Sequence, residues 1–112
     1  MTSIILYEEE RPEIRISILM RINPNGSLEL QGQDLGKLVL ELRGNSDYEY
    51  GLHIESGQKD LLKKRLVAKY PEIKSDGDLL QWFKQNYSRN EAFSKIVELL
   101  QEMDIRYDAS YW

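Results

Sequence analysis

The sequence contains no cysteine, only one histidine and only three prolines among its 112 residues. Without cysteine the chain cannot form a disulfide, a zinc–thiolate site or a cysteine nucleophile. It also lacks any apolar run near the roughly 18 residues that cross a bilayer. The start of the chain has no basic stretch typical of a signal peptide and leads into Glu8-Glu9-Glu10. We therefore expect a cytoplasmic protein that does not enter a membrane.

Positively charged residues are fewer than negatively charged ones, and most of them lie in the second half of the chain. The net charge is −4 and the isoelectric point is near 5.0, which argues against a general nucleic-acid binder. Residues 1–55 carry five Lys or Arg against ten Asp or Glu, whereas residues 56–112 carry ten against nine. Halves of opposite sign are a weak indication of a polar partner surface, although solvated faces on different elements are the commoner cause.

Length and composition predict a single domain over residues 1–112. Residues 1–12 fit either an edge strand or a flexible arm, since Pro12 cannot donate to a strand ladder. Residues 13–22 alternate apolar and polar side chains and are rich in isoleucine, which predicts a strand. Asn23-Pro24-Asn25-Gly26 has the composition of a tight turn, so residues 27–31 are expected to pair back as a hairpin.

The segment Gly32-Gln33-Asp34-Leu35-Gly36 is expected to end this second strand. The spacing of the apolar residues that follow predicts a short helix over 35–42, with Asp34 as its N-cap and Gly44 just past its end. Leucines at every second position over 38–42 also fit a strand, so both alternatives remain open.

The segment from Asp47 to Glu55 alternates without a break, which predicts a strand with one buried and one solvated face. Tyr48 and Tyr50 share the parity of two aliphatic residues and are expected to belong to the core. Gly51, on the other parity, is expected to leave a gap on the polar face.

Three helices and a last strand are predicted after this segment. Ser56 is the expected N-cap of a helix that runs to about Tyr70 and stops at Pro71. Capping boxes of the Ser-x-x-acid form begin at Ser75 and at Ser88. Residues 105–112 alternate and predict a C-terminal strand. The order β-β-α-β-α-α-α-β indicates an α+β fold, with a mostly antiparallel sheet of about four strands and helices packed on one face.

The polar face of the central strand holds the candidate binding residues, which are Asp47, Glu49, His53 and Glu55. A histidine beside carboxylates suits acid–base chemistry or a hard metal ion, although a lone histidine on a polar face is usually just solvated. A partner for His53 would have to come from the neighbouring strands, at Arg15, Ser17, Asp108 or Ser110. The terminal Trp112 is a further candidate contact, because tryptophan is favoured at interfaces.

No catalytic template fits the chain: G-x-S-x-G, H-E-x-x-H and the P-loop lysine pattern are all missing. No catalytic residue, metal ligand or cofactor is therefore predicted. Lys63-Lys64-Arg65 could touch phosphates, but three adjacent positions on a helix point in different directions, so a nucleic-acid partner is not expected.

Two stretches, Gly32-Gln33-Asp34-Leu35-Gly36 and Gly44-Asn45-Ser46-Asp47-Tyr48-Glu49-Tyr50, together with the aromatic C-terminus, resemble a set of small uncharacterised bacterial proteins. Those proteins carry a G-D-S-D-Y-E-Y-like segment, and this chain departs from it with Asn45 in place of aspartate. The resemblance implies a shared fold and a bacterial origin, and no activity.

The sequence favours a non-enzymatic protein-interaction module, similar in general character to immunity proteins, that binds a partner through the acidic strand face. The alternative is a small ligand- or metal-binding protein, or an enzyme, that uses His53 with nearby carboxylates. Oligomeric state does not follow from the sequence.

Overall fold

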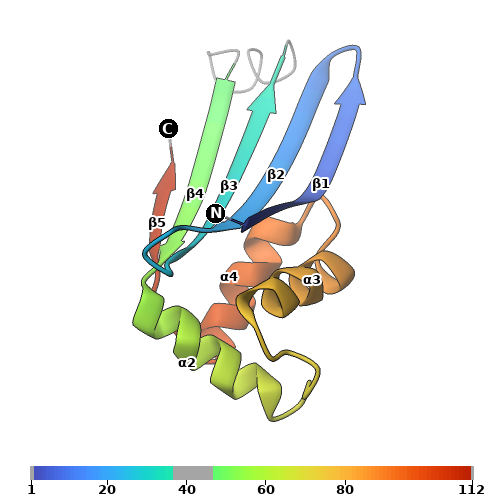
Figure 1. The fold of residues 1–112 in the computed structure, drawn as a ribbon. Coiled ribbons are helices and arrows are strands. Elements are labelled where there is room, and N and C mark those ends of the chain that lie inside the picture. The colour runs from blue at the N-terminus through green and yellow to red at the C-terminus, as the bar shows by residue number, and fades with distance from the viewer. Residues whose placement is uncertain (1, 37–46, 112) are drawn as a thin grey trace.

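The computed structural model describes residues 2–36 and 47–111, which form one antiparallel sheet and three helices (Figure 1). The five strands lie in the order β1-β2-β3-β4-β5, and each pairs with its neighbour in the sequence. Their bounds are Thr2–Arg11 for β1, Ile14–Ile22 for β2, Leu28–Leu35 for β3, Asp47–Ile54 for β4 and Asp108–Tyr111 for β5. The predicted α+β fold is confirmed, with five strands rather than about four.

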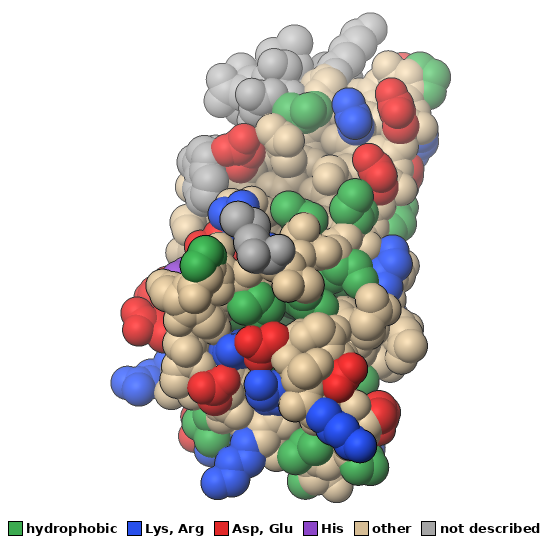
Figure 2. Space-filling model, viewed as in Figure 1, with side chains coloured by type: hydrophobic (Ala, Val, Ile, Leu, Met, Phe, Trp, Pro, Cys, Tyr) green, Lys and Arg blue, Asp and Glu red, His purple; other side chains and the backbone are tan. Residues whose placement is uncertain are grey.

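The three described helices follow β4 in the chain and gather toward one end of the sheet (Figure 1). They are α2 (Ser56–Val67), α3 (Asp76–Asn86) and α4 (Ala92–Glu102). Among the described residues, no helix is both long and apolar enough to span a bilayer. Figure 2 shows Lys and Arg side chains interspersed with Asp and Glu over this helical end.

One face of the sheet, which we call the covered face, packs against the helices. Alternation along each strand sends the aliphatic side chains to this face, and burial of apolar surface is the dominant stabilising term in folding. The strands supply its buried residues, which are Leu6, Ile16, Ile18, Met20, Ile22, Leu28, Leu30, Tyr50, Leu52 and Ile54. The helices supply others, including the fully buried Phe83 and Ile96.

The turn between β2 and β3 is the one that the sequence predicted. The N–H of Gly26 donates to the carbonyl of Asn23 at 2.9 Å, and Gly26 has a φ of +86°, which favours glycine. The expected end of β3 at Gly32 is wrong, because β3 continues to Leu35 and pairs with β2 and β4 on both sides. Asp34 is therefore a strand residue and not a helix N-cap. The predicted helix over 35–42 lies outside the described residues from position 37 onward.

Strand β1 is a ten-residue strand at the edge of the sheet. A shift in its pairing with β2 between Ile5 and Tyr7 marks a bulge at Leu6. Lys84 of α3 donates from its ammonium group to the carbonyl of Ile5 at 2.7 Å. A bulge and a lysine at an edge both discourage strand addition from outside.

The helix starts show which capping predictions hold. The box at Ser75 is confirmed, since its hydroxyl accepts from the N–H of Asp78 and the Asp78 carboxylate accepts from the N–H of Ser75, both at 3.1 Å. Ser56 is wrong as a cap, because it is already the first residue of α2. The box at Ser88 is also wrong, because its hydroxyl donates to the carbonyl of Lys84 and α4 begins only at Ala92.

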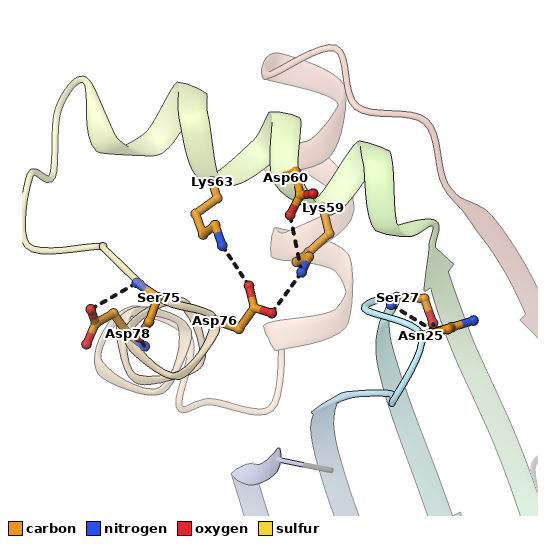
Figure 3. A network of polar contacts seen from close by, with 8 residues as sticks. All are labelled: Asn25, Ser27, Lys59, Asp60, Lys63, Ser75, Asp76 and Asp78. Atoms are coloured by element: carbon orange, nitrogen blue, oxygen red, sulfur yellow. Dashed lines mark hydrogen bonds and ion pairs between the residues drawn. The ribbon is translucent and has the colours of Figure 1, made fainter.

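A buried lysine joins α2 to α3 (Figure 3). The residue Lys59 is only 3% exposed. Its ammonium group lies 2.8 Å from the carboxylate of Asp76 and 3.2 Å from that of Asp60. Lys63 reaches the other oxygen of Asp76 at 2.8 Å. Burial alone would raise the pKa of Asp76, but the hydrogen bonds and charges of Lys59 and Lys63 outweigh it and hold the pKa below its usual value. The ion pairs of Asp76 with Lys59 and Lys63 thus hold α2 against α3.

The C-terminal strand begins later than predicted. Ile105 is buried in the core, and β5 runs only from Asp108 to Tyr111, beside β4 residues 50–53. Tyr111 remains 60% exposed and its ring lies 6.0 Å from that of Phe93 in α4. This short strand extends the sheet without adding to the core.

Candidate functional site: the open face of the sheet

The opposite face of the sheet, which we call the open face, carries the alternate residues of every strand. The strand register sets these side chains in rows that cross the sheet, such as Glu8, Ser17, Gln33 and Glu49. Its ionisable side chains within the described part are Glu8, Glu10, Arg15, Arg21, Glu29, Glu49, His53 and Asp108. All of them are exposed or half-buried. The open face thus carries five carboxylates and two guanidinium groups, so it is acidic.

The middle row of the open face is less polar than the rows on either side. Ile5 and Leu19 lie opposite each other in register, and Ile5 is 45% exposed. The same row continues through Gln31 and Gly51 to Ser110 and contains no ionisable side chain. An apolar centre with a charged margin is the usual anatomy of a protein-binding surface.

One of the two arginines is occupied by a neighbour. Arg21 donates to Glu29 at 2.8 Å across the β2–β3 pair. Burial alone would raise the pKa of Glu29, but hydrogen bonds from Arg21 and Asn23 and the charge of Arg21 lower it. This pair is neutral overall, so the acidic character of the open face comes from the remaining carboxylates.

The histidine of β4 lies beside a partner that sequence reasoning missed. Nδ1 of His53 is 3.5 Å from Oε1 of Glu29, which also accepts from the side chain of Asn23. Of the four partners considered from the sequence, Asp108 is the one directly opposite His53 in register. The solvated parity of Glu29 was visible in the sequence, but the β3–β4 register that brings it to His53 was not.

A pocket of about 420 Å³ opens where β4 ends, α2 begins and β5 begins. Its lining consists of His53, Glu55, Gly57, Gln58, Arg106, Tyr107 and Asp108. The side chain of Gln58 accepts from the N–H of Arg106 at 2.8 Å and so ties α2 to the segment before β5. Within the part of the chain that the structure describes, no ion pair joins Arg106 to Glu55 or Asp108, although all three are exposed.

A second, smaller hollow of about 200 Å³ lies on the open face between β2, β3 and β4. Its lining consists of Ser17, Leu19, Gln31, Gly32, Gln33, Glu49 and Tyr50. Gln31 is directly opposite Gly51, so the hollow lies beside the glycine at which a gap was expected. The amide of Gln33 donates to Oε1 of Glu49 at 3.0 Å and orients that carboxylate.

The five candidate binding residues proposed from the sequence therefore do not form a single site. Glu49 lines the small hollow, whereas His53 and Glu55 line the larger pocket. Asp47 begins β4, opposite Leu35, but its side chain is outside the described residues, and so is Trp112. Arg106, Gln58 and Glu29 are the polar neighbours that sequence reasoning did not find.

The tyrosines of β4 do not belong to the open face. Tyr50 is buried on the covered face, where its ring meets Phe93 edge-on at 4.8 Å and its hydroxyl donates to Asp34 at 3.3 Å. Burial first, and then the charge of Asp34, raise the pKa of Tyr50. The ring lies over Gly32, where an added Cβ would come within 1.9 Å of it. The prediction that Tyr50 belongs to the core is confirmed.

The basic stretch of α2 is engaged within the molecule. Lys63 pairs with Asp76, and the guanidinium group of Arg65 donates to the carbonyl oxygens of Met103 and Asp104. Lys64 and Arg65 are exposed, and Lys63 is half-buried. These contacts connect the helices and explain the cluster without a bound phosphate.

Metal binding finds no support in the described ranges 2–36 and 47–111, where no three His, Asp or Glu side chains come together to hold an ion.

No protein-family profile matches the sequence, and neither the curated proteins nor the solved structures include a match.

Proposed function

We propose that this protein is a non-enzymatic interaction module that binds a basic protein partner through the open face of its sheet. The observation that carries the proposal is the acidic face itself, with five carboxylates against two guanidinium groups around Ile5 and Leu19. Complementary charge steers a basic partner to such a face and excludes acidic ones. The exposed Ile5 and the half-buried Leu19 supply apolar area that becomes buried in the complex.

Charge reversal on the open face tests this proposal. A Glu8→Lys/Glu49→Lys double variant is compared with Glu72→Lys/Glu98→Lys, which makes the same change in net charge at exposed positions outside the sheet. Each tagged protein is used to capture partners from native lysate, and circular dichroism confirms that each is folded. We expect stoichiometric recovery of a basic partner to fall at least about tenfold for the first variant only.

Two outcomes would overturn the proposal. One is that the unaltered protein recovers no stoichiometric partner. The other is that both double variants lose the partner equally, because net charge and not the open face would then control binding.

The pocket at His53 supports a second candidate function, the binding of a small ligand. Its volume of about 420 Å³ falls within the roughly 300–1,000 Å³ of small-molecule sites. Its lining also includes groups of both signs, Arg106 together with Glu55 and Asp108, and a histidine able to transfer protons.

NMR of the His53 ring, recorded while divalent metals and common metabolites are added, tests the second candidate. A ligand of the pocket shifts the ring signals and the amides of Gly57 and Gln58, and a His53→Gln variant weakens that response. Unchanged signals throughout the set would remove this candidate without touching the first.

A further inference from the structure

We infer that the small hollow of the open face receives one arginine side chain of the basic partner, an inference that rests on the proposed function. The hollow holds about 200 Å³, which is less than a small-molecule site needs and suits a single inserted side chain. It lies between β2, β3 and β4, whose backbones are fixed by antiparallel pairing. The site is therefore formed before the partner arrives.

The lining of the hollow separates into an apolar wall and a polar end. Leu19 supplies the wall, and the neighbouring Ile5 extends it toward the sheet edge. Glu49 supplies the charge at the opposite side, in the row next to Leu19 and Gln31. Arginine matches this division, because its methylene stem packs on apolar surface while its guanidinium group stays with polar groups.

The carboxylate of Glu49 is held in place but keeps binding capacity. Gln33 donates to Oε1, and within the described residues Oε2 has no hydrogen-bond donor and no Lys or Arg pairs with Glu49. A carboxylate that is oriented in advance loses less side-chain entropy when it binds. An ion pair of this kind, partly desolvated by the partner, is worth more than one on an open surface.

The remaining polar groups favour arginine over lysine. Ser17 and Gln31 line the same hollow and carry a hydroxyl and an amide oxygen, and neither side chain makes a hydrogen bond within the part of the chain that is described. The guanidinium group has five donors in a planar fork and can reach several acceptors at once, whereas an ammonium group is a compact point charge. Three acceptors around one hollow suit the fork.

The test uses the full-length ¹⁵N-labelled protein and blocked amino acids as probes. N-acetyl-arginine methylamide is added and backbone amide shifts are mapped, with the lysine and norleucine analogues as comparisons. We expect saturable shifts at Leu19, Gln31, Gln33 and Glu49, a weaker response to the lysine probe, and none to norleucine, which has the stem without the charge.

Two variants connect the response to the hollow. Glu49→Gln keeps the size of the side chain and should weaken arginine binding at least about fivefold, whereas Glu72→Gln, at an exposed position outside the sheet, should leave it unchanged. Gln31→Trp fills the hollow from an exposed strand position, where an aromatic residue is well tolerated, and should abolish binding while Glu49 is retained.

Several results would overturn the inference. They are shifts spread over all surface carboxylates, shifts confined to the pocket at His53, or an undiminished response in Glu49→Gln. Capture of a partner that depends on Glu8 and Glu49, together with no arginine response in the hollow, would reject the arginine site and leave the proposed function standing. An arginine response without any captured partner would reject the proposed function alone.

Discussion

The two faces of this sheet are made by the same strands, yet they have different physical tasks. On β2, Ile18 is fully buried on the covered face, and its neighbour Leu19 is half-buried on the open face. Contacts on the covered face exclude water, so each apolar group there contributes to stability. Contacts on the open face stay solvated, and their value lies in what they present to a partner. The comparison separates residues that hold the fold from residues available for binding.

The largest expected effect comes from truncating neighbouring residues on the two faces. Ile18→Ala should lower the free energy of unfolding by about 2–5 kcal/mol, because it leaves a cavity in a fully packed region. Leu19→Ala should cost about 1 kcal/mol, since its side chain is only partly removed from water. Urea denaturation of both variants measures the difference. Equal losses would mean that the open face is buried in solution and would contradict its assignment.

The ion pair between helices α2 and α3 and the ion pair on the open face provide a second, smaller contrast. Asp76→Asn removes the charge that partners Lys59, whose side chain is only 4% exposed. We expect a loss of about 2–3 kcal/mol, less than for a fully isolated charge because Asp60 remains 3.2 Å away. Denaturant unfolding at pH 7 gives the value, and a loss near zero would show that Lys59 is hydrated and not buried.

The pH dependence of this pair has a definite sign. Because the folded-state pKa of Asp76 is below its usual value, the stabilisation is complete above about pH 4, the ordinary pKa of aspartate, and is lost as the pH falls through the lower folded-state pKa. The difference between the wild type and Asp76→Asn should therefore shrink below about pH 4. Unfolding curves from pH 7 down to pH 2 measure it, and a difference that grows in acid would contradict this pairing.

The smallest effect is expected for the corresponding pair of the open face. Glu29→Gln should cost less than about 1 kcal/mol, because Arg21 and Glu29 are both partly solvated and solvent weakens their attraction. Added salt should reduce even this difference. Thermal unfolding at low and high salt tests it, with Asp76→Asn as the comparison. A larger loss than for Asp76→Asn would contradict the expected difference between the helix–helix ion pair and the ion pair of the open face.

Local sequence patterns correctly predicted the features that depend only on residues close in the sequence. The alternation of β4 identified Tyr50 as core and Glu49 as solvated, because side chains on a strand point to opposite faces whatever the rest of the fold does. The turn at Gly26 and the capping box at Ser75 were likewise readable, since each is formed by residues at most three apart.

Patterns of the same kind failed where other contacts competed for the same groups. The sequence around Gly32 suggests a break, but pairing with β2 and β4 and the ring of Tyr50 above it keep β3 extended. Ser88 has the spacing of a capping box, but its hydroxyl donates to the end of α3 instead. At Gly32 the competing contacts come from neighbouring strands, whereas at Ser88 the competing acceptor is a carbonyl of the preceding helix, four residues away.

The sequence by itself determined the class of fold, the two parities of β4 and the acidic, cysteine-free character of the chain, because these follow from composition and from period. Only the tertiary structure decided that Glu29 meets His53, that Arg106 shares a pocket with Glu55, and that Gln33 orients Glu49 in a hollow. These contacts join residues on different strands and helices, and they depend on a register that no single segment encodes.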